Sequence, residues 1–456
     1  MRPEPPNGSA GVPEIFGGGI YGAIRRAVVI GNGFPGAENQ CLGLVRALGL
    51  SGRHSLYRVL RPRGGINEWL HWLPVSVHKK LDHFIRQIFG GSGLKVEGKK
   101  GMPLLGKKNG LLHVLEADAK QIAKVARETF DQYGPLLVIA SGRDTISIAS
   151  SIKRFAPENV FVVQIQHPRS RLDRFDLVIA PRHDYYSLNP QARQQIPWLV
   201  RRWITPCEPP GKNVVLTVGA LHQADFAALR SAASAWHEEL ASLPKPLLVV
   251  NIGGPSSNCR YGVDLAKQLA TMLQNVLWSC GSVRISFSRR TPKKVSKLLM
   301  EEFNTHPKVY IWDGEGPNPH LGHLAWADAF VITADSVSML SEACSIGKPV
   351  YVIGADRCTW KFADFQKSLA ERGVVRPFTD IRKLELLTPK RHCRGCKSGT
   401  FSTRRTRVEN SYMIDNVKLS LGQTLLGIFS ISRQFLMHLF IYLLTPSFSG
   451  SHVEHL

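Results

Sequence analysis

Acidic side chains are scarce in this sequence of 456 residues. Asp and Glu number 35 against 58 Lys and Arg, which gives a formal net charge of +23. So large a surplus indicates an anionic partner, such as nucleic acid, a phosphate-bearing ligand or an anionic membrane face. The apolar fraction of 43% and the charged fraction of 20% are ordinary for a folded protein, which excludes wholesale disorder.

The N-terminus lacks a long apolar run. Residues 1–24 are rich in Pro and Gly and contain no apolar core of the kind that a secretory signal needs. Their glycines, prolines and two glutamates also spoil an amphipathic transit helix. We therefore expect a flexible leader and a protein that stays on the cytosolic side.

Closely spaced cysteines are also few. Of the eight cysteines, only Cys393 and Cys396 form a CxxC pair, and His392 adds a third ligand where structural zinc needs four. Cysteines inside predicted elements, such as Cys41 and Cys280, are typical of reduced, buried thiols in a cytosolic protein. We predict no metal site.

Short apolar runs bounded by Gly recur along the chain, which is typical of parallel strands buried on both faces. Helical spacing follows most of them, so strands and helices alternate. We predict an α/β fold with two Rossmann-like lobes facing a cleft, as in GT-B glycosyltransferases. The lobes span residues 25–243 and 244–378, with the boundary near Leu243–Pro246. The predicted strands are 27–30, 136–140, 160–165, 176–180, 214–218, 247–252, 283–287, 309–312, 330–333 and 350–353. The predicted helices are 37–48, 145–155, 226–243, 263–280, 293–303, 337–346 and 362–372.

Two stretches interrupt this alternation. Residues 90–110 place five lysines among glycines, which indicates a mobile basic insertion, either a solvated loop or a membrane contact. Residues 379–456 form an atypical tail, basic and then apolar. Residues 419–444 make a poor transmembrane helix because Arg433 and other polar residues interrupt them, although an interfacial helix is compatible with the pattern.

Gly31, Gly33 and Gly36 spell GxGxxG between a predicted strand and a predicted helix. Glycines in this position permit a tight turn and a close approach of backbone N–H groups to a phosphate. A dinucleotide site would also need an acidic residue about 20 positions later, and Arg53 and its neighbours provide none. NAD binding is therefore not expected, and a plain strand–helix turn facing the cleft is the competing interpretation.

The second lobe carries a more informative segment. Gly253 and Gly254 follow a strand and could cradle a diphosphate. Further on, Asp335 or Ser336 is expected to cap a helix on which Ser338 and Glu342 share one face. The segment resembles the donor-binding segment of GT-B glycosyltransferases, in which a glutamate at this place holds the ribose hydroxyls. We take Gly31, Gly33, Gly36, Gly253, Gly254, Ser336, Ser338 and Glu342 as candidate binding residues, with inherited scaffolding as the alternative.

A transferase also needs an acid or a base in the first lobe. The candidates are Glu38, Asp144, His167 and His183, and no pattern in the sequence joins any of them to a second catalytic group. We therefore predict no catalytic residue and no cofactor. The tryptophans Trp69 and Trp72, followed by Lys79 and Lys80, fit either the core of the first lobe or an interfacial helix.

Several long segments resemble the plant mitochondrial fission factors called elongated mitochondria proteins, which have bacterial relatives of uncharacterised function. The segments are Arg25–Gly36, Asn67–Pro74, Gly142–Ser150, Gln164–Arg169, Pro181–Tyr186 and Asn258–Gln268. The resemblance runs from about Val12 to Phe378. After Phe378 the family continues with a short acidic and aromatic stretch and a final helix, so an alternative exon or a retained intron would explain the different tail here.

The resemblance implies a peripheral protein of the outer mitochondrial membrane, on its cytosolic face, that recruits a dynamin-related GTPase to fission sites. An anionic membrane surface is then the second partner, and a vestigial nucleotide-sugar ligand remains open. The alternative is an active GT-B glycosyltransferase that uses a nucleotide-sugar donor. Nucleic-acid binding is the weakest interpretation, because the charge is scattered and no recognition motif is present.

Overall fold

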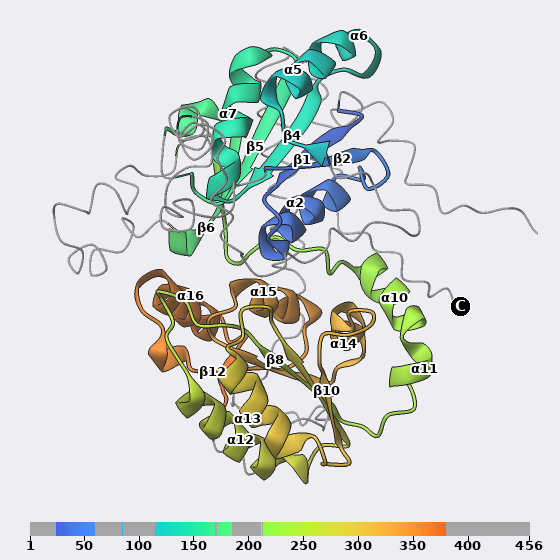
Figure 1. Cartoon of the computed structure of the whole chain (residues 1–456), viewed down its shortest axis with the longest axis vertical. Coiled ribbons are helices and arrows are strands. Elements are labelled where there is room, and N and C mark those ends of the chain that lie inside the picture. The colour runs from blue at the N-terminus through green and yellow to red at the C-terminus, as the bar shows by residue number, and fades with distance from the viewer. Residues whose placement is uncertain are drawn as a thin grey trace, which may run out of the picture.

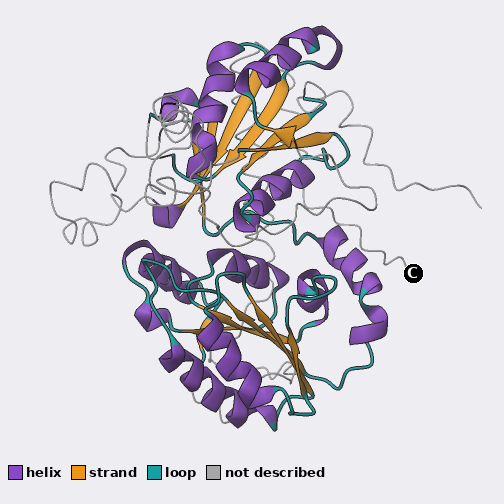
Figure 2. Ribbon diagram, viewed as in Figure 1, coloured by secondary structure: helices purple, strands orange, loops and turns teal. Residues whose placement is uncertain are grey.

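The computed structural model describes residues 24–59, 115–168, 171–184 and 213–379, together with residues 84 and 211. Each of two lobes contains one sheet with helices packed on both faces (Figures 1 and 2). The predicted basic insertion 90–110, the two tryptophans, the CxxC pair and the tail from residue 380 lie outside the described residues.

The first lobe is built on a seven-stranded sheet in the order β3-β2-β1-β4-β5-β6-β7, and all neighbours pair in parallel. Its strands are β1 (Ala27–Gly31), β2 (His54–Arg58), β3 (Leu115–Glu116), β4 (Leu136–Ser141), β5 (Val160–Ile165), β6 (Leu177–Pro181) and β7 (Val214–Thr217). The central strands are apolar and buried on both faces because helices cover both.

Helices of the first lobe divide its core into two layers. One face of the sheet packs against α5 (Ala119–Glu128) and α7 (Ile146–Phe155), and the other packs against α2 (Pro35–Ala47). Asp118 begins α5 by accepting hydrogen bonds from the N–H groups of Lys120 and Gln121. Short elements complete the lobe: α6 (Phe130–Tyr133) and the 3-10 helices η2 (Arg143–Thr145), η3 (Leu172–Arg174) and η4 (Arg182–Asp184).

The second lobe is built on a six-stranded parallel sheet in the order β10-β9-β8-β11-β12-β13. Its strands are β8 (Leu247–Ile252), β9 (Ser282–Phe287), β10 (Val309–Trp312), β11 (Ala329–Thr333), β12 (Val350–Ile353) and β13 (Arg376–Pro377). α12 (Val263–Leu277) and α13 (Lys293–Phe303) cover one face. α14 (His320–Trp326), α15 (Val337–Ile346) and α16 (Trp360–Glu371) cover the other, and η6 (Ala355–Arg357) precedes α16.

The predicted fold class is confirmed, since two separate parallel sheets with helices on both faces make up the described chain. The predicted helix 226–243 is wrong in its length. It is divided into α10 (Phe226–Ala235) and α11 (His237–Leu240), and Trp236 between them adopts a non-helical conformation with ψ 16°. α10 packs against α14 of the second lobe.

None of the helices among the described residues is long and apolar enough to cross a membrane. The cysteines Cys41, Cys259, Cys280, Cys344 and Cys358 are free thiols. Burial raises the pKa of the Cys41 and Cys344 thiols, and raises that of Cys280 to about 11. These thiols are protonated at neutral pH.

Candidate functional site

The carboxyl ends of the central strands of both sheets meet at the junction of the lobes. β1 leads into α2 on the side of the first lobe, and β11 leads into α15 on the side of the second (Figure 1). In parallel α/β sheets, this edge is where ligands bind. The junction therefore brings together the glycine turns and the helix that the sequence singled out.

The first glycine turn is filled by a carboxylate of the chain itself. The Gly33 N–H donates to Glu38 Oε1 over 2.8 Å. Arg58 Nε and one of its terminal nitrogens donate to the two Glu38 oxygens, each over 2.7 Å, so the carboxylate is held by a bidentate fork. A Cβ atom at Gly31 would lie 2.4 Å from Glu38 Oε1. Gly31 is therefore needed for the close approach of Glu38, which occupies the place of an anion in this turn.

The second glycine turn is filled in the same way by Asp335. The Gly254 N–H donates to Asp335 Oδ2 over 2.9 Å, and the Tyr261 hydroxyl donates to Asp335 Oδ1 over 3.1 Å. Arg290 donates to Asp335 Oδ2 over 3.2 Å. A Cβ atom at Gly253 would lie 2.3 Å from Asp335 Oδ2. Burial raises the pKa of Asp335, against the hydrogen bonds and the Arg290 charge that lower it.

Glu342 lies between the lobes and is bound from both sides. Asn39 Nδ2, on α2 of the first lobe, donates to Glu342 Oε1 over 2.8 Å. His320 Nε2, at the start of α14, lies 2.7 Å from Glu342 Oε2. Burial alone would raise the pKa of Glu342, but the His320 charge and its hydrogen bond bring it below its ordinary value. Burial alone would lower the pKa of His320, but the Glu342 charge and the hydrogen bond to Glu342 together raise it above its ordinary value.

Ser336, one of the two residues predicted to cap α15, is its N-cap residue, but its side chain makes no capping hydrogen bond. Asp335 points instead to the glycine turn of β8. Ser338 and Glu342 both face α2, since a Cβ atom at Gly36 would lie 3.6 Å from Ser338 Oγ. Gly347 ends α15 in the left-handed conformation, with φ 77°.

The catalytic candidates of the first lobe follow the carboxyl ends of four different strands, β1, β4, β5 and β6. Glu38 is held by Arg58, and Asp144 lies in η2 after β4. His167 follows β5 in a loop. His183 is buried in η4, with its ring centroid 5.0 Å from that of Phe365 on α16, and burial lowers its pKa to about 4. His183 is thus a neutral packing residue between the lobes.

Sequence reasoning missed the residues that close the junction. Asn39, His320, Tyr261 and Arg290 were not singled out, because each becomes meaningful only through a partner far along the chain. His320 could not be identified for a second reason, because it lies at the start of α14, a helix of seven residues that was not predicted. No spacing in the sequence identifies these four residues.

More contacts join the lobes around Glu342. The Ala220 N–H of the first lobe donates to Ser341 Oγ of the second over 2.9 Å. Within the first lobe, Gln223 donates to the Asn39 side chain and so holds the residue that contacts Glu342. Lys361 on α16 lies 2.9 Å from Asp184 Oδ1 of the first lobe. The chain's own side chains therefore engage both glycine turns and the Glu342 carboxylate, and Gly36 of the first lobe lies beside Ser338 of the second. No cluster of three metal-ligating side chains is found within the described ranges.

Comparison with protein families and curated proteins gives consistent matches. A family model described as "Mitochondrial fission ELM1" matches residues 35–393. The "Mitochondrial fission protein ELM1" of Arabidopsis thaliana is 65% identical over 391 residues, which cover 84% of this chain and 92% of that protein. The "Uncharacterized protein RP120" of Rickettsia prowazekii is 30% identical over 275 residues, 56% of this chain and 75% of that protein.

Solved structures with a weak similarity to this chain include a UDP-GlcNAc 2-epimerase and MurG. The UDP-GlcNAc 2-epimerase of Methanocaldococcus jannaschii superposes with a TM-score of 0.42 at 13% identity, over 78% of this chain and 90% of that chain. MurG of Acinetobacter baumannii superposes with a TM-score of 0.36 at 11% identity, over 92% of this chain and 99% of that chain.

Proposed function

Because this chain belongs to the mitochondrial fission ELM1 family and so functions in mitochondrial fission, we propose that it acts there as an adaptor without catalytic turnover. Its place is the cytosolic face of the outer mitochondrial membrane, where it recruits a dynamin-related GTPase. The resemblance to the elongated mitochondria proteins supports this partner and this location.

The observation that carries the adaptor proposal is the state of the candidate donor site. Three carboxylates, Glu38, Asp335 and Glu342, occupy or engage the groups that a nucleotide sugar would need. A diphosphate near Asp335 would face a carboxylate in place of the free N–H groups that bind anions. A ribose at Glu342 would have to displace hydrogen bonds from both Asn39 and His320. These contacts favour a fixed interface between the lobes over an open ligand-binding cleft.

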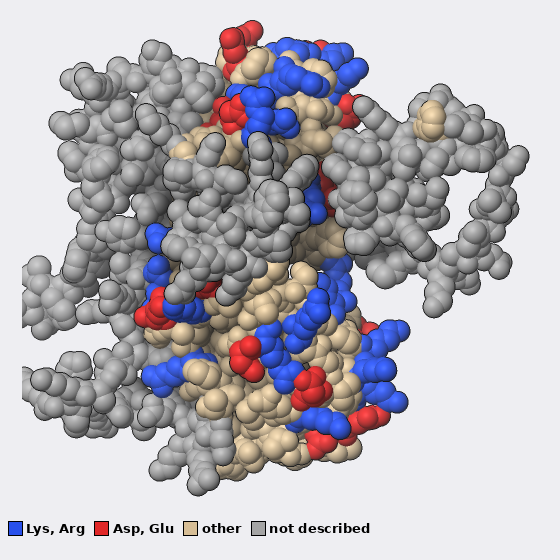
Figure 3. Space-filling view, turned by 90° about the vertical axis from the view of Figure 1, so that its left-hand side faces the viewer, with Lys and Arg blue, Asp and Glu red and all other residues tan. Residues whose placement is uncertain are grey.

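Basic residues on the second lobe support an anionic surface as the second partner. Arg289, Arg290, Lys293 and Lys294 are all exposed and lie in and next to the first turn of α13. Figure 3 shows Lys and Arg side chains spread over one face of the protein, with Asp and Glu between them. Each cation near an anionic membrane contributes about 1 kcal/mol, so a few of them suffice for weak, reversible binding.

Calorimetry tests whether the site binds a donor. The full chain is titrated with UDP-GlcNAc and with UDP, and we expect no saturable heat with either. Saturable binding that is lost in Glu342→Ala would overturn the adaptor proposal in favour of a nucleotide-sugar enzyme.

Complementation of cells with elongated mitochondria tests the fission role and the surface together. The full chain is expected to shorten the mitochondria and to raise the fraction of dynamin-related GTPase bound to them. The double substitution Lys293→Glu/Lys294→Glu should reduce membrane association at least roughly 30-fold, since losing the two cations alone removes about 2 kcal/mol and the two new carboxylates add repulsion.

A matched control is Lys120→Glu/Lys124→Glu, which makes the same change of charge on exposed positions of α5. If both double variants lost membrane association equally, the net charge of the protein would determine binding, and the position of Lys293 and Lys294 would not. No recruitment of the GTPase by the full chain would contradict the proposed partner.

A further inference from the structure

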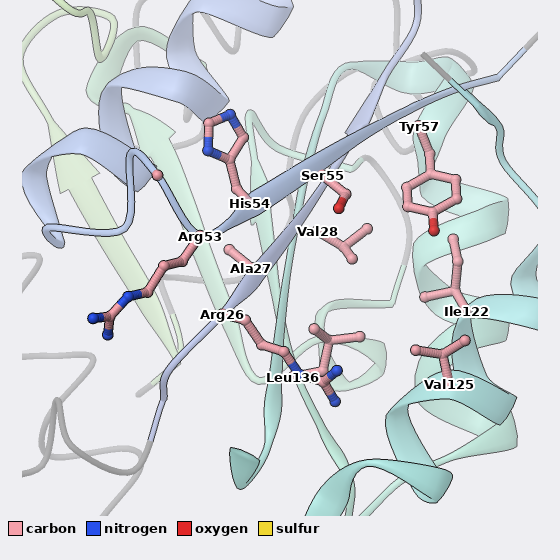
Figure 4. Close-up of a pocket in the computed structure, with 11 residues that line it drawn as sticks. Arg26, Ala27, Val28, Arg53, His54, Ser55, Tyr57, Ile122, Val125 and Leu136 are labelled. Atoms are coloured by element: carbon pink, nitrogen blue, oxygen red, sulfur yellow. The ribbon is translucent and has the colours of Figure 1, made fainter. Parts of the chain in front are cut away.

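A cavity of about 330 Å³ lies in the first lobe, at the end of the sheet opposite the junction. Ala27, His54 and Leu136 line it, and each is the first residue of its strand. Figure 4 shows the cavity between the sheet and α5, which contributes Ile122 and Val125. The cavity is therefore separate from the glycine turns, which follow the other ends of the strands.

The walls of the cavity divide into an apolar and a polar part. Val28, Ile122 and Leu136 are buried and apolar. Ser55 and Tyr57 are two residues apart on β2, so their side chains stand on one face of the sheet, and Figure 4 shows both extending toward the side of α5. An apolar wall beside two hydroxyl groups suits a ligand with an apolar body and a polar end.

Arg26 provides the charge on this wall. Its guanidinium lies 5.1 Å from the centroid of the Tyr133 ring, and one terminal nitrogen donates to Thr129. Its Nε is buried and has no hydrogen-bond partner. Burial lowers the pKa of Arg26, and the electrostatic interaction with Tyr133 opposes this shift. A buried donor on a cation without an acceptor is costly, and an anion in the cavity would satisfy it.

The charged side chains that line the cavity are cationic. They are Arg26 and Arg53, and no Asp or Glu is found among the described residues that line it. Arg53 is exposed at the mouth, and Figure 4 shows its side chain pointing away from the cavity, where it can attract an anion without blocking entry.

We propose that this cavity binds an amphipathic anion, with the apolar or aromatic body against Val28, Ile122 and Leu136 and the anionic group at Arg26 and the Ser55 hydroxyl. The anion is a phosphate, carboxylate or sulfonate. A soluble metabolite and a membrane lipid can both present this chemistry. The inference does not depend on the adaptor role, because the cavity and the junction share no residue.

The test uses fluorescence of 8-anilinonaphthalene-1-sulfonate, an aromatic sulfonate, with the full chain. N-phenyl-1-naphthylamine, which has nearly the same body without the charge, serves as the neutral probe. Arg26→Gln should weaken sulfonate binding about tenfold, the effect of losing a charge-assisted hydrogen bond, and leave the neutral probe within about twofold. Ser55→Phe should abolish binding of both probes, since the ring fills the cavity.

Arg284→Gln is the matched control. Arg284 also stacks on a tyrosine, with 4.8 Å from its guanidinium carbon to the centroid of the Tyr310 ring, and burial lowers its pKa as well. It lies in the second lobe and should leave both probes unaffected. Circular dichroism checks that each variant is folded. Because Ser55 is exposed on a strand, Ser55→Phe keeps the test decisive if Arg26→Gln does not fold.

Displacement of the sulfonate separates the two sources of ligand. Competition by phenyl phosphate would assign a soluble anion, and competition by dihexanoyl phosphatidic acid alone would assign a lipid. Sulfonate binding that is unchanged in both Arg26→Gln and Ser55→Phe, or equally weakened in Arg284→Gln, would overturn the proposal.

Discussion

Asp335 holds three elements of the second lobe together, and its removal should be measurable in the thermal stability. Asp335→Ala takes the acceptor away from the Gly254 N–H, the Tyr261 hydroxyl and Arg290. The Gly254 N–H is buried, and a buried donor left without a partner costs about 1–3 kcal/mol. Arg290 is half exposed, so water hydrates its guanidinium once Asp335 is removed. Losing this ion pair therefore costs about 0–1 kcal/mol.

Together these losses amount to about 3 kcal/mol for Asp335→Ala, which corresponds to a fall in melting temperature of roughly 6–12 °C for a domain of this size. Asp335→Asn keeps an oxygen acceptor for the Gly254 N–H and gives up the charge that burial disfavours. We expect it to cost about 1 kcal/mol or less, a fall of roughly 2–4 °C at most. The difference between the two variants isolates the hydrogen bonds from the charge.

The assay is circular dichroism on heating, with Asp264→Ala as the control, since Asp264 is exposed and binds only Arg357 and its local backbone. The pKa of Asp335 is raised on folding. The contribution of the raised pKa to the free energy of unfolding is therefore fully present below the ordinary pKa of 3.8, and it is lost as the pH rises through the raised pKa. The wild type should thus be most stable relative to Asp335→Asn in acid. Equal melting temperatures of Asp335→Ala and Asp335→Asn would refute the reasoning.

Three further outcomes are expected. For Glu342→Gln, the loss of melting temperature should be largest between pH 4.5 and 6.5, the ordinary pKa values of Glu and His. It should shrink above the raised pKa of His320 and below the lowered pKa of Glu342, and a loss that is the same from pH 3 to 9 would contradict the ion pair. Gly322→Ala should destabilise the protein by about 1–3 kcal/mol in urea, because the new Cβ would lie 2.5 Å from the Trp236 ring. Gly52→Ala, which meets open space, should not do so. Mild oxidation with diamide should join Cys259 to Cys358, which oppose each other in an antiparallel bridge, and Cys358→Ser should prevent the shift on a non-reducing gel.

The sequence was informative about the sheets because strands buried on both faces are continuous apolar runs. β1, β4, β5, β8 and β11 were all located from such runs. β2 was missed because His54, Ser55 and Arg58 give it no apolar run, and it belongs to the sheet only through pairing with β1. α14 was missed because His320 and His323 replace apolar residues in a seven-residue helix.

The sequence indicated where the glycine turns and Glu342 lie along the chain, but it did not indicate which side chains contact them. Gly31, Gly253 and Glu342 were found from local patterns, since turns and helix ends depend on nearby residues. The identity of what fills the turns is a tertiary property. The sequence left Asp335 and Ser336 as alternative caps of α15, and only the fold shows that Asp335 faces the glycine turn that follows β8.

The contact between Asn39 and Glu342 also sets an order of events during synthesis. The two residues are 303 positions apart. At about 5–20 residues per second, a ribosome needs roughly 15–60 s to make the intervening chain. The first lobe therefore emerges long before its counterpart, and the polar face of α2 must wait in solvent or against a chaperone until α15 has left the exit tunnel. A chain cut short before α15 leaves Asn39 without its Glu342 partner, so the two lobes cannot be joined at this point.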